Sequence, residues 1–452
     1  MKFQYFIKIR ILCCFILLSQ GLISYAQIGF SFENGVKKDK ISFELINNLV
    51  VIPIELNGVQ LSFLLDTGVN NTILFGVTQA DSISLNAAVP IKIKGLGNEI
   101  EVSAIKSSGN TMSIGDAKDQ NHTVFVVFNE MVDFSKRMGI PIHGIIGSNF
   151  YRDFVVKTNY NSKRITFYTP DKFKFKKCRR CEEFEIEFYK NKPYIKANVL
   201  DDSLEQESIL LVDSGSSDAL WLFDENDFIE ITPKNYFEDF LGMSITGGIF
   251  GKRSRIDGLV LGNFTLNDIT VAFPKIIEGD SLRMYKNRAG SIGGEVLKRF
   301  TVLMDYQSRR MLLRANTQFK RPFNYNLSGL TLEYDGTVQI KELQDIRSEG
   351  MNMKNSNAGK NVGSVDVMID PIYSLFTAPK VVIAELRANS PAALAGLKRG
   401  DAIVKVNGKY AYKYKIYELT ALFSSKEGRK ITIEYERDEV FKVVDFILKR
   451  IL

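Results

Sequence analysis

The sequence predicts a mainly β protein in which one β-rich lobe occurs twice and is followed by a β-rich domain of another kind. Apolar runs of strand length end in Asp66-Thr67-Gly68 and, much later, in Asp213-Ser214-Gly215. The offset between the two aspartates is 147 residues (213 − 66). Further along each half, Gly147 is answered by Gly293 at an offset of 146 residues (293 − 147). An offset this constant indicates a duplicated lobe.

Each of the two turns holds a carboxylate at the end of a strand. Gly68 and Gly215 allow the backbone to turn tightly and a ligand to approach closely. The hydroxyls of Thr67 and Ser214 are suited to bracing the turns through side-chain hydrogen bonds. We therefore expect these four residues to support a pair of carboxylates.

The first motif, Asp66-Thr67-Gly68-Val69 with the downstream stretch 145–147, resembles the active-site signature of retropepsin-like aspartic proteases. Asp213-Ser214-Gly215 with the stretch 291–293 resembles its second copy, and the similarity covers about residues 42–315. The resemblance implies two acid-protease β lobes in one chain, as in the two-lobed, pepsin-type bacterial relatives. A monomer would then hold a complete active site. Val69 stands where the family usually has a smaller residue.

The resemblance also implies the chemistry. Two carboxylates held close together cannot both ionise cheaply, so they share one proton. The ionised partner takes a proton from a water that attacks a peptide carbonyl, and the protonated partner donates to the carbonyl oxygen. Asp66 and Asp213 are the predicted catalytic pair of an aspartic endopeptidase, and this reaction requires no metal or cofactor.

Glycine-rich stretches between each aspartate and its later glycine are candidates for flaps that close over a peptide. The first lobe offers Gly95 and Gly97, and the second offers Gly247 and Gly248 at the matching place. Closure of such hairpin tips would exclude water from the site. An ordinary surface hairpin has the same composition and remains the alternative.

Residues 1–26 are predicted to be a signal peptide, because basic residues at the N-terminus are followed by an apolar stretch and then by small residues. An uncleaved membrane anchor is the alternative. Cleavage would lower the formal charge from +7 to +4, because three basic residues leave. The sequence thus predicts export, to the periplasm or cell envelope of a Gram-negative bacterium. The lobes are expected at 27–170 and 194–320, with 171–193 as their connection.

That connection contains a basic run, 172–180, followed by an acidic run, 182–188. We expect them to pair as neighbouring antiparallel strands with complementary charges, which disfavours nucleic-acid binding. Cys178 and Cys181 are expected to form a local disulfide in an oxidising compartment, and a redox role is the alternative. His143, close to the first lobe's later glycine, is expected to be structural.

The C-terminal part, 321–452, follows a different pattern, with a Pro-started short helix at 390–397 and turns at 400–401 and 407–408. It resembles the PDZ domain of bacterial envelope proteases over about 322–450. The resemblance implies a groove flanked by a helix at 417–423 that receives the C-terminus of a peptide. The candidate carboxylate-binding loop is formed by Leu327, Ser328, Gly329 and Leu330. Residues 340–380 depart from the family pattern and are expected to hold an insertion.

Together these features predict an exported aspartic endopeptidase whose PDZ domain recruits or positions a protein substrate. The alternative is a catalytically inactive scaffold that binds peptides or proteins through the PDZ domain.

Overall fold

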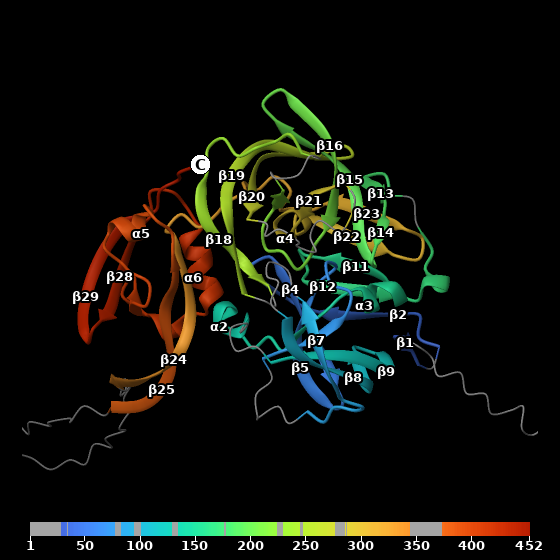
Figure 1. Ribbon diagram of the computed structural model, residues 1–452, viewed down its shortest axis with the longest axis horizontal. Helices are drawn as coiled ribbons and strands as arrows, with labels where there is room; N and C mark the ends of the chain where they lie inside the picture. Colours follow the sequence, from blue (N-terminus) through green and yellow to red (C-terminus); the bar gives the residue numbers. More distant parts are fainter. Residues whose placement is uncertain are drawn as a thin grey trace, which may run out of the picture. The chain divides into compact units, whose positions relative to one another are not determined.

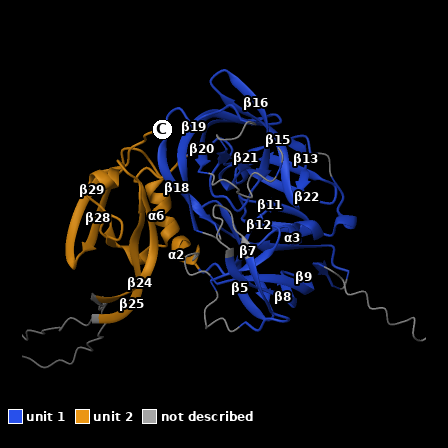
Figure 2. Ribbon diagram, viewed as in Figure 1, with its two compact units in different colours: residues 1–133, 141–323 blue, residues 134–140, 324–452 orange. Residues whose placement is uncertain are grey.

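The computed structural model is mainly β and divides into two compact units (Figures 1 and 2). One unit comprises residues 1–133 and 141–323, and the other comprises residues 134–140 and 324–452. The structure describes residues 29–33, 35–76, 83–94, 101–128, 134–175, 178–223, 229–244, 247–275, 285, 287–343 and 373–452.

The first lobe is built on a nine-stranded sheet with the order β1-β9-β6-β10-β5-β4-β8-β7, in which β3 also pairs with β4. Its strands are β1 (Ser31–Phe32), β3 (Glu44–Ile46), β4 (Leu49–Leu56), β5 (Val59–Leu65), β6 (Thr72–Leu74), β7 (Val89–Lys94), β8 (Glu101–Ile114), β9 (Ala117–Val127) and β10 (Gly144–Ile146). Apolar side chains of β4 and β5 such as Ile52 and Phe63 are fully buried, which places the strand that leads to Asp66 in the core.

The second lobe repeats this plan in an eight-stranded sheet with the order β14-β15-β16-β21-β17-β20-β19-β18. Its strands are β14 (Glu187–Tyr189), β15 (Lys192–Asp201), β16 (Leu204–Val212), β17 (Leu220–Leu222), β18 (Phe237–Ser244), β19 (Gly247–Leu261), β20 (Phe264–Pro274) and β21 (Arg288–Ile292). The parallel pair β16–β21 corresponds to the parallel pair β5–β10 of the first lobe. The predicted duplication is confirmed at the level of sheet topology.

A third, six-stranded sheet joins the lobes in the order β13-β23-β22-β11-β12-β2. The first lobe supplies β2 (Lys38–Ser42), β11 (Val155–Asn159) and β12 (Arg164–Tyr168), and the second supplies β13 (Cys181–Glu185), β22 (Phe300–Asp305) and β23 (Arg310–Ala315). The central pair, β11 and β22, is antiparallel over five residues of each strand. A short helix precedes each of these two strands: α3 (Ser148–Asp153) and α4 (Gly294–Leu297). The lobes are therefore one continuous structure.

The expected pairing between the basic and acidic runs of the connection is wrong. The described part of the basic run forms only the 3-10 turn η2 (Pro170–Lys172) and irregular chain, and β13 pairs with β23 instead. The Arg310 guanidinium lies 3.8 Å from the Glu183 carboxylate, so a distant strand supplies the complementary charge. Alternating charge predicted a charged partner strand but could not say which one. The expected disulfide between Cys178 and Cys181 is present.

The second unit contains a six-stranded sheet in the order β24-β25-β26-β28-β29, with β27 paired to β26. Its elements are α2 (Phe134–Met138), β24 (Leu330–Leu343), β25 (Tyr373–Leu386), α5 (Pro391–Leu394), β26 (Ala402–Val406), β27 (Lys409–Tyr410), the 3-10 turn η4 (Ala411–Lys413), α6 (Ile416–Phe423), β28 (Lys430–Arg437) and β29 (Val440–Ile447). Ser390 caps α5, because its hydroxyl accepts the N–H of Ala393.

Two of the predicted segments lie partly or wholly outside the described residues. The ends of the expected insertion at 340–380 are a continuation of the β24–β25 ladder, and its middle, 344–372, lies outside the described residues. The expected signal peptide at 1–26 also lies outside them. Within the described part of the chain, no helix has the length and apolar character needed to cross a membrane.

Candidate active site

The two predicted catalytic aspartates occupy equivalent places in the two lobes. Asp66 directly follows β5, and its N–H donates to the carbonyl oxygen of Ile146 in β10 at 2.8 Å. Asp213 directly follows β16, and its N–H donates to the carbonyl oxygen of Ile292 in β21 at 2.9 Å. Gly147, which follows β10, lies against the backbone of Asp66. A Cβ at this position would be only 2.4 Å from the Asp66 carbonyl oxygen, so a side chain does not fit there. In each lobe, a parallel neighbour strand fixes the backbone that carries the carboxylate.

The hydroxyls of Thr67 and Ser214 lock the two turns to each other. The Thr67 hydroxyl donates to the carbonyl oxygen of Val212 at 2.6 Å and accepts the N–H of Ser214 at 3.0 Å. The Ser214 hydroxyl donates to the carbonyl oxygen of Leu65 at 2.9 Å and accepts the N–H of Thr67 at 3.0 Å. Both side chains are buried, so these four bonds are shielded from water. This reciprocal network joins the ends of β5 and β16.

Each carboxylate is held by the glycine of its own turn and lies against the glycine of the other. The N–H of Gly68 donates to Asp66 Oδ1 at 2.6 Å, and the N–H of Gly215 donates to Asp213 Oδ1 at 3.0 Å. A Cβ added to Gly215 would lie 2.1 Å from Asp66 Oδ2, and one added to Gly68 would lie 2.7 Å from Asp213 Oδ1. The structure therefore brings the two predicted catalytic residues together, and only glycine leaves room for them.

The site favours one protonated carboxyl group. Burial raises the pKa of Asp66 to about 8, and the negative charge of Asp213 is the second cause. The N–H of Gly68 and the Lys192 ammonium act on this pKa in the opposite direction. Burial in turn lowers the pKa of Lys192, while the charges of Asp213 and Asp66 work against that shift. Two nearby carboxylates and one partly buried cation thus form a single electrostatic unit.

Two tyrosines that sequence reasoning missed support this unit from within the core. Tyr151 of α3 and Tyr306, which follows β22, stack with their ring centroids 5.4 Å apart. Burial raises the pKa of both hydroxyls well above the ordinary value, and the Tyr151 hydroxyl lies within hydrogen-bond reach of Ser214. Lys192 was also missed. The signal available for Tyr151 was its place directly after the repeated glycine motif, whereas nothing in the sequence marked Lys192.

The flap candidates are partly described. In the first lobe, β7 and β8 form a hairpin whose last described pair is Lys94 and Glu101, and its tip, with Gly95 and Gly97, lies outside the described residues. In the second lobe, β18 and β19 form the matching hairpin. Gly247 and Gly248 begin β19 at its tip. Both hairpins lie where the sequence places them, and their role as flaps remains a prediction.

His143 makes the contacts of a structural residue. Its Nδ1 accepts the N–H of Ser62 at 3.0 Å, and its backbone N–H donates to the Ser62 carbonyl oxygen at 2.8 Å. These two bonds fasten the loop before β10 to β5, the strand that leads to Asp66.

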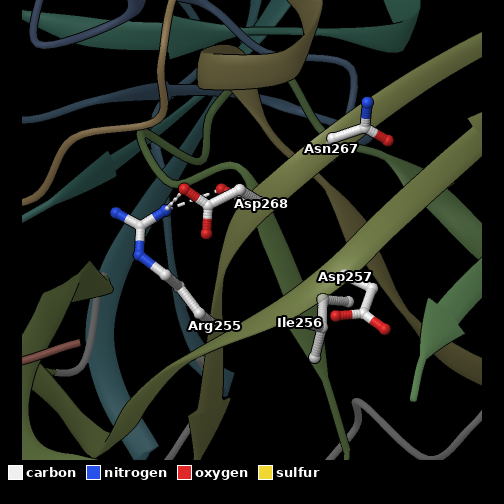
Figure 3. Close-up of a pocket in the computed structure, with 5 residues that line it drawn as sticks. All are labelled: Arg255, Ile256, Asp257, Asn267 and Asp268. Carbon is white, nitrogen blue, oxygen red and sulfur yellow. Dashed lines mark hydrogen bonds and ion pairs between the residues drawn. The ribbon is translucent and has the colours of Figure 1, made fainter.

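A surface hollow lies on β19 and β20 of the second lobe (Figure 3). Inside it, the Arg255 guanidinium donates to the carbonyl oxygen of Asp268 at 2.6 Å and pairs with its carboxylate at 3.0 Å. It is lined by Arg255, Ile256, Asp257, Asn267 and Asp268. None of these five residues belongs to the dyad or to the hairpin tips, so the hollow is not the catalytic site.

The candidate carboxylate-binding loop of the second unit is buried and internally bonded. The N–H groups of Ser328 and Gly329 donate to the side-chain oxygen of Asn326, at 3.0 and 3.1 Å. The N–H of Leu330 donates to the Ser328 hydroxyl, and the N–H of Leu327 donates to a carbonyl oxygen at the end of α6. A peptide carboxylate would have to displace these acceptors.

Comparisons with known proteins find similarities to aspartic proteases and to PDZ domains. Among solved structures, the chain is similar to an aspartic proteinase from Irpex lacteus, with 12% sequence identity and a TM-score of 0.41. That alignment covers 63% of this chain and 99% of the other. No curated protein matches the chain. Residues 52–150 match the family model described as aspartyl protease, and residues 382–437 match the model described as PDZ domain. Residues 52–150 are thus similar to aspartyl proteases, and residues 382–437 are similar to PDZ domains.

Proposed function

We propose that the protein is an exported aspartic endopeptidase in which Asp66 and Asp213 activate a water for attack on a peptide bond. The observation that carries this proposal is the reciprocal Thr67–Ser214 network, because it holds each carboxylate against the glycine turn of the other lobe. Both carboxylates belong to one chain, so a monomer holds the whole site. The substrate is a peptide or protein, and the PDZ domain positions it.

The electrostatics support separate roles for the two carboxyl groups. Asp66 is the more buried of the two carboxyl groups, and burial raises its pKa, so we assign the shared proton to Asp66 near neutral pH. It would donate this proton to the oxygen of the scissile carbonyl. Asp213, when ionised, would accept a proton from the attacking water. The N–H groups of Gly68 and Gly215 keep one oxygen of each carboxyl group in place during these transfers.

The pH dependence of kcat/KM tests this assignment. Activity is expected to fall as the pH rises through about 8, because Asp66 then loses the proton that it must donate. The Lys192 ammonium lowers the pKa of Asp66, so Lys192→Met should move this alkaline limb to higher pH by about half a unit or more. Lys196→Met, an exposed change on the same strand, should leave the limb in place. A limb that moved equally in both variants would contradict the assignment.

Export is supported by the basic and apolar pattern of residues 1–26. Expression in a Gram-negative host should yield a mature periplasmic protein that begins at Gln27, as read by N-terminal sequencing. Full-length protein that stays in the cytoplasm would contradict this part of the proposal. A Leu17→Arg variant, which interrupts the apolar stretch, is expected to retain the full-length precursor inside the cell.

A further inference from the structure

The first lobe's chain contributes a segment to the PDZ unit. Residues 134–140, with helix α2, belong to the same compact unit as residues 324–452 (Figure 2). The chain then returns to the protease unit, where β10 begins at Gly144 and supplies the carbonyl oxygen that holds the N–H of Asp66. The PDZ unit is thus linked to the catalytic lobes through this inserted segment as well as through the chain at residues 323–324.

Helix α2 packs against the two elements that form the walls of a PDZ peptide groove. It contacts β24 and α6 in the same unit. Among the described residues, β24 pairs with β25 alone, so its other edge is the one to which a peptide strand would add. Gly139, with a φ of +73°, lies so close to α6 that a Cβ would be 2.7 Å from the Ile416 nitrogen. The inserted segment therefore lies against both elements that would form the walls of a peptide groove.

Two ion pairs hold the segment 134–140 to strands β24 and β25. The Arg137 guanidinium pairs with two acids of the unit, at 3.1 Å from Glu333 of β24 and at 3.3 Å from Glu385 of β25. The Arg137 side chain is 18% exposed, so the pairs are partly shielded from solvent. Met138, the next residue, is buried at 7% exposure. One cation on α2 thus meets two carboxylates on neighbouring strands, and an apolar side chain is buried beside it.

The candidate carboxylate-binding loop, residues 327–330, has its backbone N–H groups already occupied. The N–H groups of residues 327–330 already donate to acceptors within the unit, and Asn326 provides the central one. Ser328 is fully buried, and a Cβ on Gly329 would lie 2.2 Å from the Ser390 Cβ. The loop is packed like a structural turn. None of these four described residues has a free backbone N–H that could bind the C-terminus of a peptide.

We propose that the PDZ unit holds residues 134–140 of its own chain as an internal ligand at β24 and α6, so that an external peptide must displace this segment to reach the groove. The docking itself does not rest on the proposed peptidase activity. The partner of this surface is a cationic, Met-containing helix that matches the acidic edge formed by Glu333 and Glu385. Any peptide that competes for the edge would need a comparable cation.

Hydrogen–deuterium exchange of the full mature protein tests the docking without a substrate. The amides of α2 and of β24 near Glu333 should be protected in the native protein. Arg137→Glu should lower the protection of both segments at least tenfold, because it places a third negative charge beside two carboxylates. Arg450→Glu, an exposed charge reversal elsewhere in the unit, should leave both unchanged. The double variant Arg137→Glu with Glu333→Arg should restore part of the protection.

The double variant also separates loss of docking from loss of folding, since restored protection shows that the unit folds. Two results would overturn the proposal. One is rapid exchange of α2 in the native protein, at the rate of an undocked segment. The other is protection that is unaffected by Arg137→Glu. Because neither readout depends on peptide hydrolysis, failure here is distinguishable from failure of the proposed activity.

Discussion

Asp66→Asn and Asp213→Asn should each abolish peptide hydrolysis, with kcat falling at least ~1000-fold, while the protein stays folded. Each substitution removes one of the two ionisable groups that must share a proton, and Asn keeps the side-chain oxygen that accepts the glycine N–H of its turn. The measurement is kcat on a cleaved peptide, with circular dichroism as the control for folding. The two losses should not add in the double variant, because the aspartates act as one unit.

The pattern of loss across the two variants is informative. If Asp66→Asn were inactive while Asp213→Asn retained most of its activity, the shared-proton account would be wrong. Asp218→Asn is a matched control, since this acid of the second lobe pairs with Arg253 instead of with the dyad.

Gly215→Ala should lower kcat/KM about 100-fold or more, through a displacement of the Asp66 carboxylate. The new methyl group would lie 2.1 Å from Asp66 Oδ2, so the carboxylate must move. A displacement on the order of 1 Å at a reacting group costs activity of this size. Stability should change less, by about 2 kcal/mol at most, because the atom that gives way is the end of a side chain. Peptide hydrolysis and thermal unfolding measure the two effects separately.

Gly242→Ala is the matched control, because a Cβ at that position meets no atom within 4 Å. It should leave kcat/KM within about twofold of the native value. Equal activities of Gly215→Ala and Gly242→Ala would mean that the carboxylates are not held as closely as the structure shows.

The site could be predicted from the sequence because its parts are local and repeated. Asp66 and Asp213 each lie in a three-residue turn after an apolar strand, and the resemblance to retropepsin-like aspartic proteases implied that the two aspartates lie together. The sequence also predicted that the Thr67 and Ser214 hydroxyls support the turns. It could not show that each hydroxyl bonds to the turn of the other lobe. Lys192 could not be found, because its effect on the dyad comes from the fold of β15 and not from a sequence motif.

The errors have a common physical origin in contacts between distant segments. The acidic strand β13 pairs with β23, more than a hundred residues away, and not with the neighbouring basic run. The departure of α2 into the PDZ unit is another example, since residues 134–140 read as part of the first lobe. Local charge and apolar patterns state what kind of partner a segment needs. They do not identify which of several suitable partners it meets.

Hydrolysis of a mixed peptide library by the mature protein, between pH 3 and 8, tests the central claim most directly. A statine-type analogue of the tetrahedral intermediate should be included, because a dyad that stabilises this species binds it more tightly than substrate. The account predicts cleavage at internal peptide bonds that the analogue blocks. A folded protein that cleaves nothing across this range and does not bind the analogue would contradict it and would favour a catalytically inactive scaffold that acts through its PDZ domain.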